Sequence, residues 1–156
     1  MGFYSFLLEQ NSILTICITA WFIAQVTKTI INFLLMKEFK AERLWGAGGM
    51  PSSHSALVCS ALVATGREVG TRSPLFALAF VLAAIVMYDA MGVRRAAGEQ
   101  AKVLNQLLFD WMDHNKQLFP NTNQTKELKE MLGHTPIEVL SGALLGVLVG
   151  FIVPVM

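Results

Sequence analysis

The chain has 156 residues, of which 54% are hydrophobic and 15% are charged, and its formal net charge is +1. Soluble domains of this length carry fewer apolar residues, so the composition argues against that class and favours a membrane protein. The net charge carries no information about nucleic acid, but no basic stretch is interleaved with aromatic residues as a nucleic-acid-binding groove requires, so we expect no nucleic-acid partner.

The first predicted membrane span is Ile13–Met36, preceded by an amphipathic lead-in at residues 1–10. At about 1.5 Å per residue the span crosses a hydrocarbon layer of about 30 Å. Because the N-terminus has no basic region and no small-residue cleavage site, we do not expect a removable signal. Gln25, Lys28 and Asn32 share one face of this helix. A lysine inside a span normally points into the bundle or a wet cavity, although its side chain can also extend to the nearby membrane surface.

A glycine-rich turn at residues 46–55 leads into the second apolar segment, Ser52–Gly66. Gly49 allows a close backbone approach. Ser52 and Ser53 bring hydroxyl groups to a helix N-terminus, where unpaired N–H groups and the helix dipole favour an anion. His54 adds a group that exchanges a proton near neutral pH, although a capped helix can also carry a histidine with no function.

The rest of the chain predicts two further spans separated by a more polar region. Leu75–Val93 is apolar except for Asp89 near its end. The remaining predicted elements are a polar-faced helix, a loop, a short charged helix and a last span, at Arg94–Asn115, 120–125, Lys126–Leu132 and Ile137–Met156. In the last span a stripe of glycines recurs every four residues, at Gly142, Gly146 and Gly150, and this stripe is typical of a helix-packing face within the fold or in a homodimer.

The distribution of basic residues sets the expected orientation. Nine of the twelve lysines and arginines fall in the segments after the first and third spans, which places those segments in the cytoplasm. The sequence therefore predicts an all-α integral membrane bundle with about four transmembrane helices. It forms one domain, 1–156, with a cytoplasmic-face helical insertion at 96–132. Cys17 and Cys59 lie in apolar stretches, so we expect them to be small buried residues rather than a disulfide or a pair of metal ligands.

The start of the last span carries a second candidate cluster. Thr135 as N-cap, Pro136 at the first helical position and Glu138 three residues after the cap predict a capping box, which explains these three residues without any function. It does not explain His134. If Glu138 also contacts this imidazole, it holds the ring in one tautomer, as a nitrogen nucleophile requires.

A third cluster follows the third span. Asp89, Arg94, Arg95 and Glu99 lie within eleven residues of each other. The two arginines could serve only as topology signals, and Arg95 with Glu99 has the spacing of an ordinary surface ion pair.

The motifs resemble those of a known family. Pro51-Ser52-Ser53-His54 resembles the Pro-Ser-Gly-His signature of the type 2 phosphatidic acid phosphatase family, and the segment from His134 to Gly146 resembles the end of its next signature. Over nearly its full length the chain looks like the divergent branch of that family, which comprises small bacterial and plastid membrane proteins related to acid phosphatases and vanadium-dependent haloperoxidases.

The resemblance implies a phosphatase that uses no metal or other cofactor and acts on a lipid phosphate. His134 would attack phosphorus and form a phosphohistidine, Glu138 would orient it, and His54 would protonate the leaving group and then activate water. Candidate phosphate ligands are Ser52, Ser53, Gly49, Lys28, Lys37, Arg43, Arg94 and Arg95, with Asp89 and Glu99 as additional site residues. The family places an arginine six residues before the nucleophilic histidine. Leu128 stands there in this chain, and the nearest substitutes are Arg94 and Arg95.

The expected function is therefore hydrolysis of a lipid phosphomonoester, with phosphatidate, phosphatidylglycerol phosphate or a polyprenyl phosphate as substrate. The expected site lies at the cytoplasmic face of a bacterial inner membrane or a plastid membrane, and no nucleic acid is involved. Two alternatives stay open. One is a non-catalytic protein that binds or transports lipid phosphates. The other is a Mg²⁺-dependent lipid-headgroup transferase or kinase, with oxygen ligands from Asp89, Glu99, Asn105 and Glu138.

Overall fold

The computed structural model describes residues 11–36, 49–114, 128 and 133–155. These residues form five α-helices and no strand: α2 (Ser12–Met36), α3 (Ser53–Val69), α4 (Pro74–Met91), α5 (Val93–His114) and α6 (Pro136–Ile152). The all-α prediction is confirmed, and every predicted helix within the described residues is present. The predicted lead-in at 1–10, the loop at 120–125 and the short helix at Lys126–Leu132 belong almost entirely to parts of the chain outside this description.

Two stretches are long and apolar enough to cross a membrane, Ser12–Leu34 and Pro74–Met112, and α6 is a shorter apolar helix. Many large apolar side chains of these helices face outward, as they do where a helix contacts lipid. Phe22 in α2 is 61% exposed and Leu82 in α4 is 55% exposed. The chain is a helical membrane protein.

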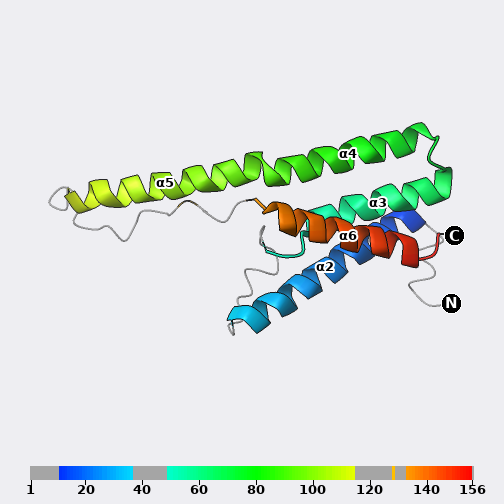
Figure 1. Ribbon diagram of the computed structural model, residues 1–156, viewed down its shortest axis with the longest axis horizontal. Coiled ribbons are helices and arrows are strands. Elements are labelled where there is room, and N and C mark those ends of the chain that lie inside the picture. Colours follow the sequence, from blue (N-terminus) through cyan, green and yellow to red (C-terminus); the bar gives the residue numbers. More distant parts are fainter. Residues whose placement is uncertain (1–10, 37–48, 115–127, 129–132, 156) are drawn as a thin grey trace.

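Helix α3 is the centre of the bundle and packs against α2, α4 and α6. Figure 1 shows α3 and α6 side by side and running in the same direction, with α4 antiparallel to α3. The N-termini of α3 and α6 therefore meet at one end of the bundle, beneath the point where α4 ends (Figure 1). Small residues allow this close packing, because the buried side of α3 is mostly serine and alanine.

The glycine stripe of α6 packs against the backbone of α3. A Cβ atom at Gly142 would collide with the carbonyl oxygen of Ser52, and one at Gly146 would collide with that of Ala56. At Gly150 the nearest atom would be the Val63 side chain, at 2.8 Å. The stripe thus serves packing within the fold, which is one of the two roles that the sequence allowed for it.

The opposite end of the bundle is closed by polar contacts. The Arg67 guanidinium donates Nη1 hydrogen bonds to the carbonyl oxygens of Gly150 (2.5 Å) and Val153 (2.7 Å), at the C-terminus of α6. Ser12 Oγ donates to Glu68 Oε2 at 2.5 Å, which ties the start of α2 to the end of α3. Arg67 thereby satisfies two of the carbonyl groups at the C-terminal end of α6, where a helix has no hydrogen-bond donors of its own.

Helix α5 continues the line of α4 beyond the bundle (Figure 1). The break between them is the single residue Gly92, whose backbone angles of φ −103° and ψ −86° depart from helical values. Further along α5, the Asn105 side chain is buried and bonds both backbone groups of Leu128, with Nδ2 donating to the carbonyl at 2.9 Å and Oδ1 accepting the N–H at 3.0 Å.

Candidate active site

His134 is fixed to the end of α4 by its backbone. Gly133 has a φ of +89°, and a Cβ atom there would collide with the backbone of Arg94 and Arg95, so only glycine lets the chain pass this close. The His134 N–H then donates to the carbonyl of Ala90 at 2.9 Å. The residue is 4% exposed, and its position therefore depends on α4 as much as on its own helix.

Glu138 connects several parts of the site. Its Oε2 lies 3.1 Å from Nδ1 of His134 and accepts the N–H of Thr135 at 3.0 Å, while its own N–H donates to Thr135 Oγ1 at 3.4 Å. The predicted capping box is thus present, and the same carboxylate also contacts the imidazole. The Glu138 carbonyl accepts the N–H of Ser52 at 3.0 Å, which joins the first turn of α6 to the turn before α3.

His54 approaches the same place from the first turn of α3. Ser52 caps this helix, with Oγ accepting the Ser55 N–H at 3.3 Å and the Ser55 hydroxyl at 3.0 Å. This cap fixes the first turn of α3, which carries His54. The centroids of the His54 and His134 rings are 6.4 Å apart, and the angle between the ring planes is 58°. The two imidazoles come from separate helix N-termini.

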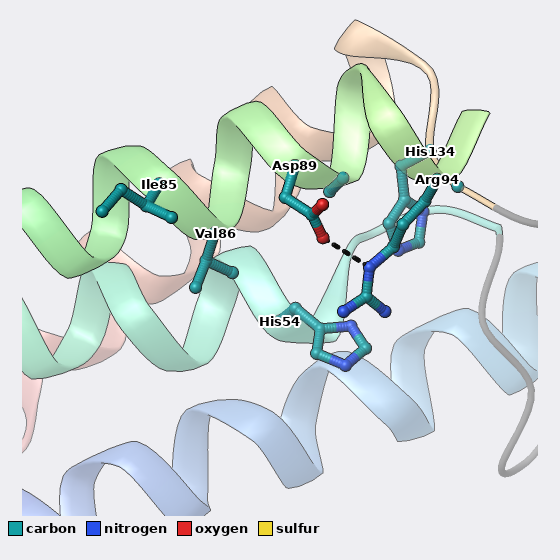
Figure 2. A pocket seen from close by; sticks show the side chains of 8 residues that line it. His54, Ile85, Val86, Asp89, Arg94 and His134 are labelled. Atoms are coloured by element: carbon teal, nitrogen blue, oxygen red, sulfur yellow. Dashed lines mark hydrogen bonds and ion pairs between the residues drawn. The ribbon is translucent and has the colours of Figure 1, made fainter. Parts of the chain in front are cut away.

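A cavity of about 140 Å³ lies beside the two rings. Arg94 reaches into it from the start of α5, with Nε 2.7 Å from Oδ2 of Asp89 on the last turn of α4 (Figure 2). The cavity is lined by His54, Ile85, Val86, Asp89, Ala90, Arg94, Gly133 and His134. Sites for whole drug-sized ligands measure about 300–1,000 Å³, so this one suits a single small group such as phosphate.

The surroundings of His54 are cationic. Arg94, Lys28 and His134 all lie close enough to act electrostatically on the His54 charge. Lys28 is 2% exposed within the bundle, which excludes the alternative that its side chain extends to the membrane surface. A Cβ atom at Gly49 would lie 3.2 Å from Lys28 Cδ, so the glycine-rich turn packs directly on the lysine stem. Glu138 provides a compensating negative charge for Lys28.

Three sequence-predicted residues are placed differently from our expectation. Ser52 is fully buried and its hydroxyl and N–H are both used within the protein, so its side chain does not line the cavity as a phosphate ligand would. Arg95 does not line the cavity and pairs with Glu99 at 3.1 Å, the surface ion pair that their spacing allowed. Ser53 is buried in the first turn of α3, next to His54. Lys37 and Arg43 lie outside the described residues.

The ligand set of the Mg²⁺ alternative does not come together. Asp89 lines the cavity and Glu138 contacts His134, whereas Glu99 binds Arg95 and Asn105 binds the Leu128 backbone. Within the described part of the chain, no group of three or more histidine, cysteine, aspartate or glutamate residues is arranged to hold a metal ion.

Sequence reasoning missed the apolar wall formed by Ile85, Val86 and Ala90. A partial signal was available, since Ile85 and Val86 lie four and three residues before Asp89, on the face of α4 that carries this carboxylate. In a uniformly apolar span, however, no pattern distinguishes a wall of a cavity from a surface in contact with lipid.

Comparisons with known proteins identify the family of the chain. The family model described as "Divergent PAP2 family" matches residues 9–149. The "Uncharacterized membrane protein YuiD" of Bacillus subtilis (strain 168) is 44% identical over 130 residues, which cover 80% of this chain and 82% of that protein. No solved structure matches the chain. The match over nearly all of the sequence places both histidines, Glu138 and Arg94 inside the family region, and the chain belongs to the divergent PAP2 family.

Proposed function

We propose that the protein hydrolyses the phosphomonoester of a membrane lipid through a phosphohistidine intermediate. The observation that carries this proposal is the convergence of two imidazoles, 6.4 Å apart, on a small cavity that Arg94 also enters. Attack on phosphorus begins from a contact of about 3 Å, and proton transfer from a hydrogen bond of about 3 Å. The two rings are close enough together for both imidazoles to contact one phosphoryl group.

In the first step His134 is the nucleophile. The Glu138 carboxylate accepts a hydrogen bond from Nδ1, so the ring proton stays there and Nε2 keeps its lone pair. Nε2 forms the N–P bond as the bond from phosphorus to the lipid oxygen breaks. Protonated His54 donates its proton to the departing oxygen, and the lipid alcohol leaves.

In the second step His54, now neutral, accepts a proton from water. The water oxygen bonds to phosphorus while the N–P bond breaks, and its electron pair returns to Nε2. Inorganic phosphate is released, and both histidines regain their starting protonation states.

Phosphate oxygens need donors throughout this cycle. Arg94 supplies a guanidinium group from inside the cavity. The N–H groups of Ser53 and His54 belong to the first turn of α3, which has no acceptors of its own for them. Arg94 thus takes the role of the arginine that the wider family carries six residues before its histidine, and it reaches the site from a different helix.

Two features of the cavity support a lipid substrate: its small volume suits a headgroup phosphate, and one of its walls is apolar. The remainder of the substrate stays in the bilayer beside α4. The basic residues that follow the first and third spans support a cytoplasmic location for this end of the bundle. Labelling of Lys102→Cys on α5 tests this orientation. Modification by a membrane-impermeant maleimide only from the periplasmic side would reverse it.

Purified protein assayed with phosphatidate, phosphatidylglycerol phosphate and polyprenyl phosphate, each with and without EDTA, tests the function. We expect phosphate release that survives EDTA and falls by at least about 10³-fold in His134→Ala. His114→Ala is the matched control, because His114 lies at the far end of α5 and contacts the Asp110 carbonyl. Binding of these lipids without turnover would instead support the carrier alternative, and strict dependence on Mg²⁺ and nucleotide would support a kinase.

A further inference from the structure

The Asp89–Arg94 pair raises a question that the proposed mechanism leaves open. A carboxylate next to the phosphate-binding arginine could compete with the substrate for it, or it could hold the arginine ready. The two roles predict opposite effects on phosphate affinity when the carboxylate is removed. The geometry of the contact distinguishes between them.

We propose that Asp89 is a positioning residue that aims the guanidinium of Arg94 into the cavity, an inference that rests on the proposed function of the site. The contact uses Nε of Arg94 and Oδ2 of Asp89, 2.7 Å apart. Within the described residues neither Nη group of Arg94 has a hydrogen-bond partner, and Figure 2 shows both of them directed toward the His54 ring. Asp89 therefore occupies one edge of the guanidinium and leaves the other edge for an anion.

A guanidinium group can serve two anions in this way. It carries five N–H donors in a rigid fork, and a phosphate takes two of them in parallel. The side chain of Arg94 is 51% exposed, so without a partner it would occupy many rotamers and would lose that freedom when it binds. The contact with Asp89 restricts the side chain before the substrate arrives, which is preorganisation in the usual sense.

The break in the helix makes this contact possible. Asp89 and Arg94 are five residues apart, and in an uninterrupted α-helix such positions point about 140° away from each other. Only residues three or four apart are neighbours on a helix face. The irregular backbone at Gly92 turns the start of α5 so that Arg94 faces back toward Asp89. The pair thus depends on the same junction that receives His134 at the Ala90 carbonyl.

The test measures binding of inorganic phosphate to the full-length protein in nanodiscs by calorimetry, so that it does not depend on turnover. We expect Asp89→Asn to weaken phosphate binding about tenfold, the size typical of one charge-assisted hydrogen bond. Asp89→Glu, which can still reach Nε, is expected to restore most of the affinity. Glu99→Gln removes a similar pair outside the cavity and should leave the affinity unchanged.

A double-mutant cycle with Arg94→Lys separates positioning from a general structural role. Lysine keeps an ion pair with Asp89 but has no second edge, so we expect Arg94→Lys alone to weaken phosphate binding and Asp89→Asn to add little to it. Additive losses would overturn the inference, as would tighter phosphate binding in Asp89→Asn, the sign of competition. If Asp89→Asn does not fold, unchanged affinity in Arg94→Lys overturns it as well.

Failure of the inference and failure of the proposed function give different results. A wild-type protein that binds phosphate with the expected mutant pattern but releases none from lipids retains the inference and loses the phosphatase. If the wild-type protein hydrolyses lipid phosphates, but wild type and Asp89→Asn bind phosphate with equal affinity, the phosphatase is retained and the inference about Asp89 is lost. A wild-type protein that does not bind phosphate at all contradicts both.

Discussion

The two ends of the bundle each carry an arginine that reaches across helices, and the two side chains are used differently. Arg67 directs Nη1 at two backbone carbonyls, those of Gly150 and Val153, and completes the C-terminus of α6. Arg94 contacts a carboxylate through Nε and leaves its Nη groups facing a cavity. The residue type and its membrane depth are therefore poor guides to its role, whereas the edge of the guanidinium that is already in use indicates whether a ligand can still bind.

The largest effect that this comparison predicts is on activity. Replacing Arg94 by alanine should lower phosphate release by roughly 10²–10³-fold, as loss of a preorganised donor does in other enzymes. Because the ion pair with Asp89 is half exposed, stability should change by less than about 1 kcal/mol. Phosphate release is measured against thermal unfolding of the same preparation, and a large loss of stability would mean that Arg94 resembles Arg67.

The packing between the two ends provides the next test. Gly146→Ala should destabilise the bundle by about 2–3 kcal/mol, since its Cβ would meet the backbone oxygen of Ala56, which cannot move without displacing α3. At Gly150 an added Cβ would meet the Val63 side chain at 2.8 Å and would lie farther, 3.3 Å, from the backbone oxygen of Ser60, so Gly150→Ala should cost about 1 kcal/mol. Unfolding in detergent with increasing denaturant compares the two variants, and equal costs would contradict a backbone-to-backbone contact at Gly146.

Arg67→Ala should separate stability from chemistry at the far end. We expect a loss of about 1–2 kcal/mol, reduced from the value for two buried charged hydrogen bonds because one of them is exposed. Activity per folded molecule should stay at the wild-type level. A selective loss of activity at full stability would place Arg67 in the chemistry and remove the contrast with Arg94.

The smallest effect is expected at the exposed pair one turn along α5. Glu99→Gln should change stability by less than about 0.5 kcal/mol, because both side chains are at least half exposed and water screens their attraction. Activity should also be unaffected. A measurable loss of phosphate release would mean that Arg95 and Glu99 take part in the site, and it would contradict their placement outside the cavity.

The helices and the pairing of the two histidines could be predicted from the sequence. Apolar length predicted α2 and α4, and the four-residue spacing of glycines predicted a packing face on α6. The relation of Glu138 to His134 followed from a capping box that places the carboxylate one turn after the imidazole. Such features are local, since they depend on residues within about one helical turn.

The sequence could not predict which of the two adjacent arginines lines the cavity. Arg94 and Arg95 are chemically identical, and the irregular backbone at Gly92 decides which one turns toward the cavity. In the same way, the sequence offers Ser52 as a phosphate ligand, and only the packing of α6 on its carbonyl reveals that it is fully used as a cap. Tertiary contacts assign these roles, and no spacing in the chain encodes them.

The size of the cavity has a consequence for a protein that is surrounded by phospholipid. Most of the lipids around it are phosphodiesters, which carry a second substituent on phosphorus and surround the protein in enormous excess. If the site acts on a phosphomonoester, a space of about 140 Å³ bounded by Ile85 and Val86 favours a terminal phosphoryl group over one that carries a choline or glycerol beyond it. The size of the cavity would then reduce the competition of the bulk lipids with a rare monoester for the two histidines.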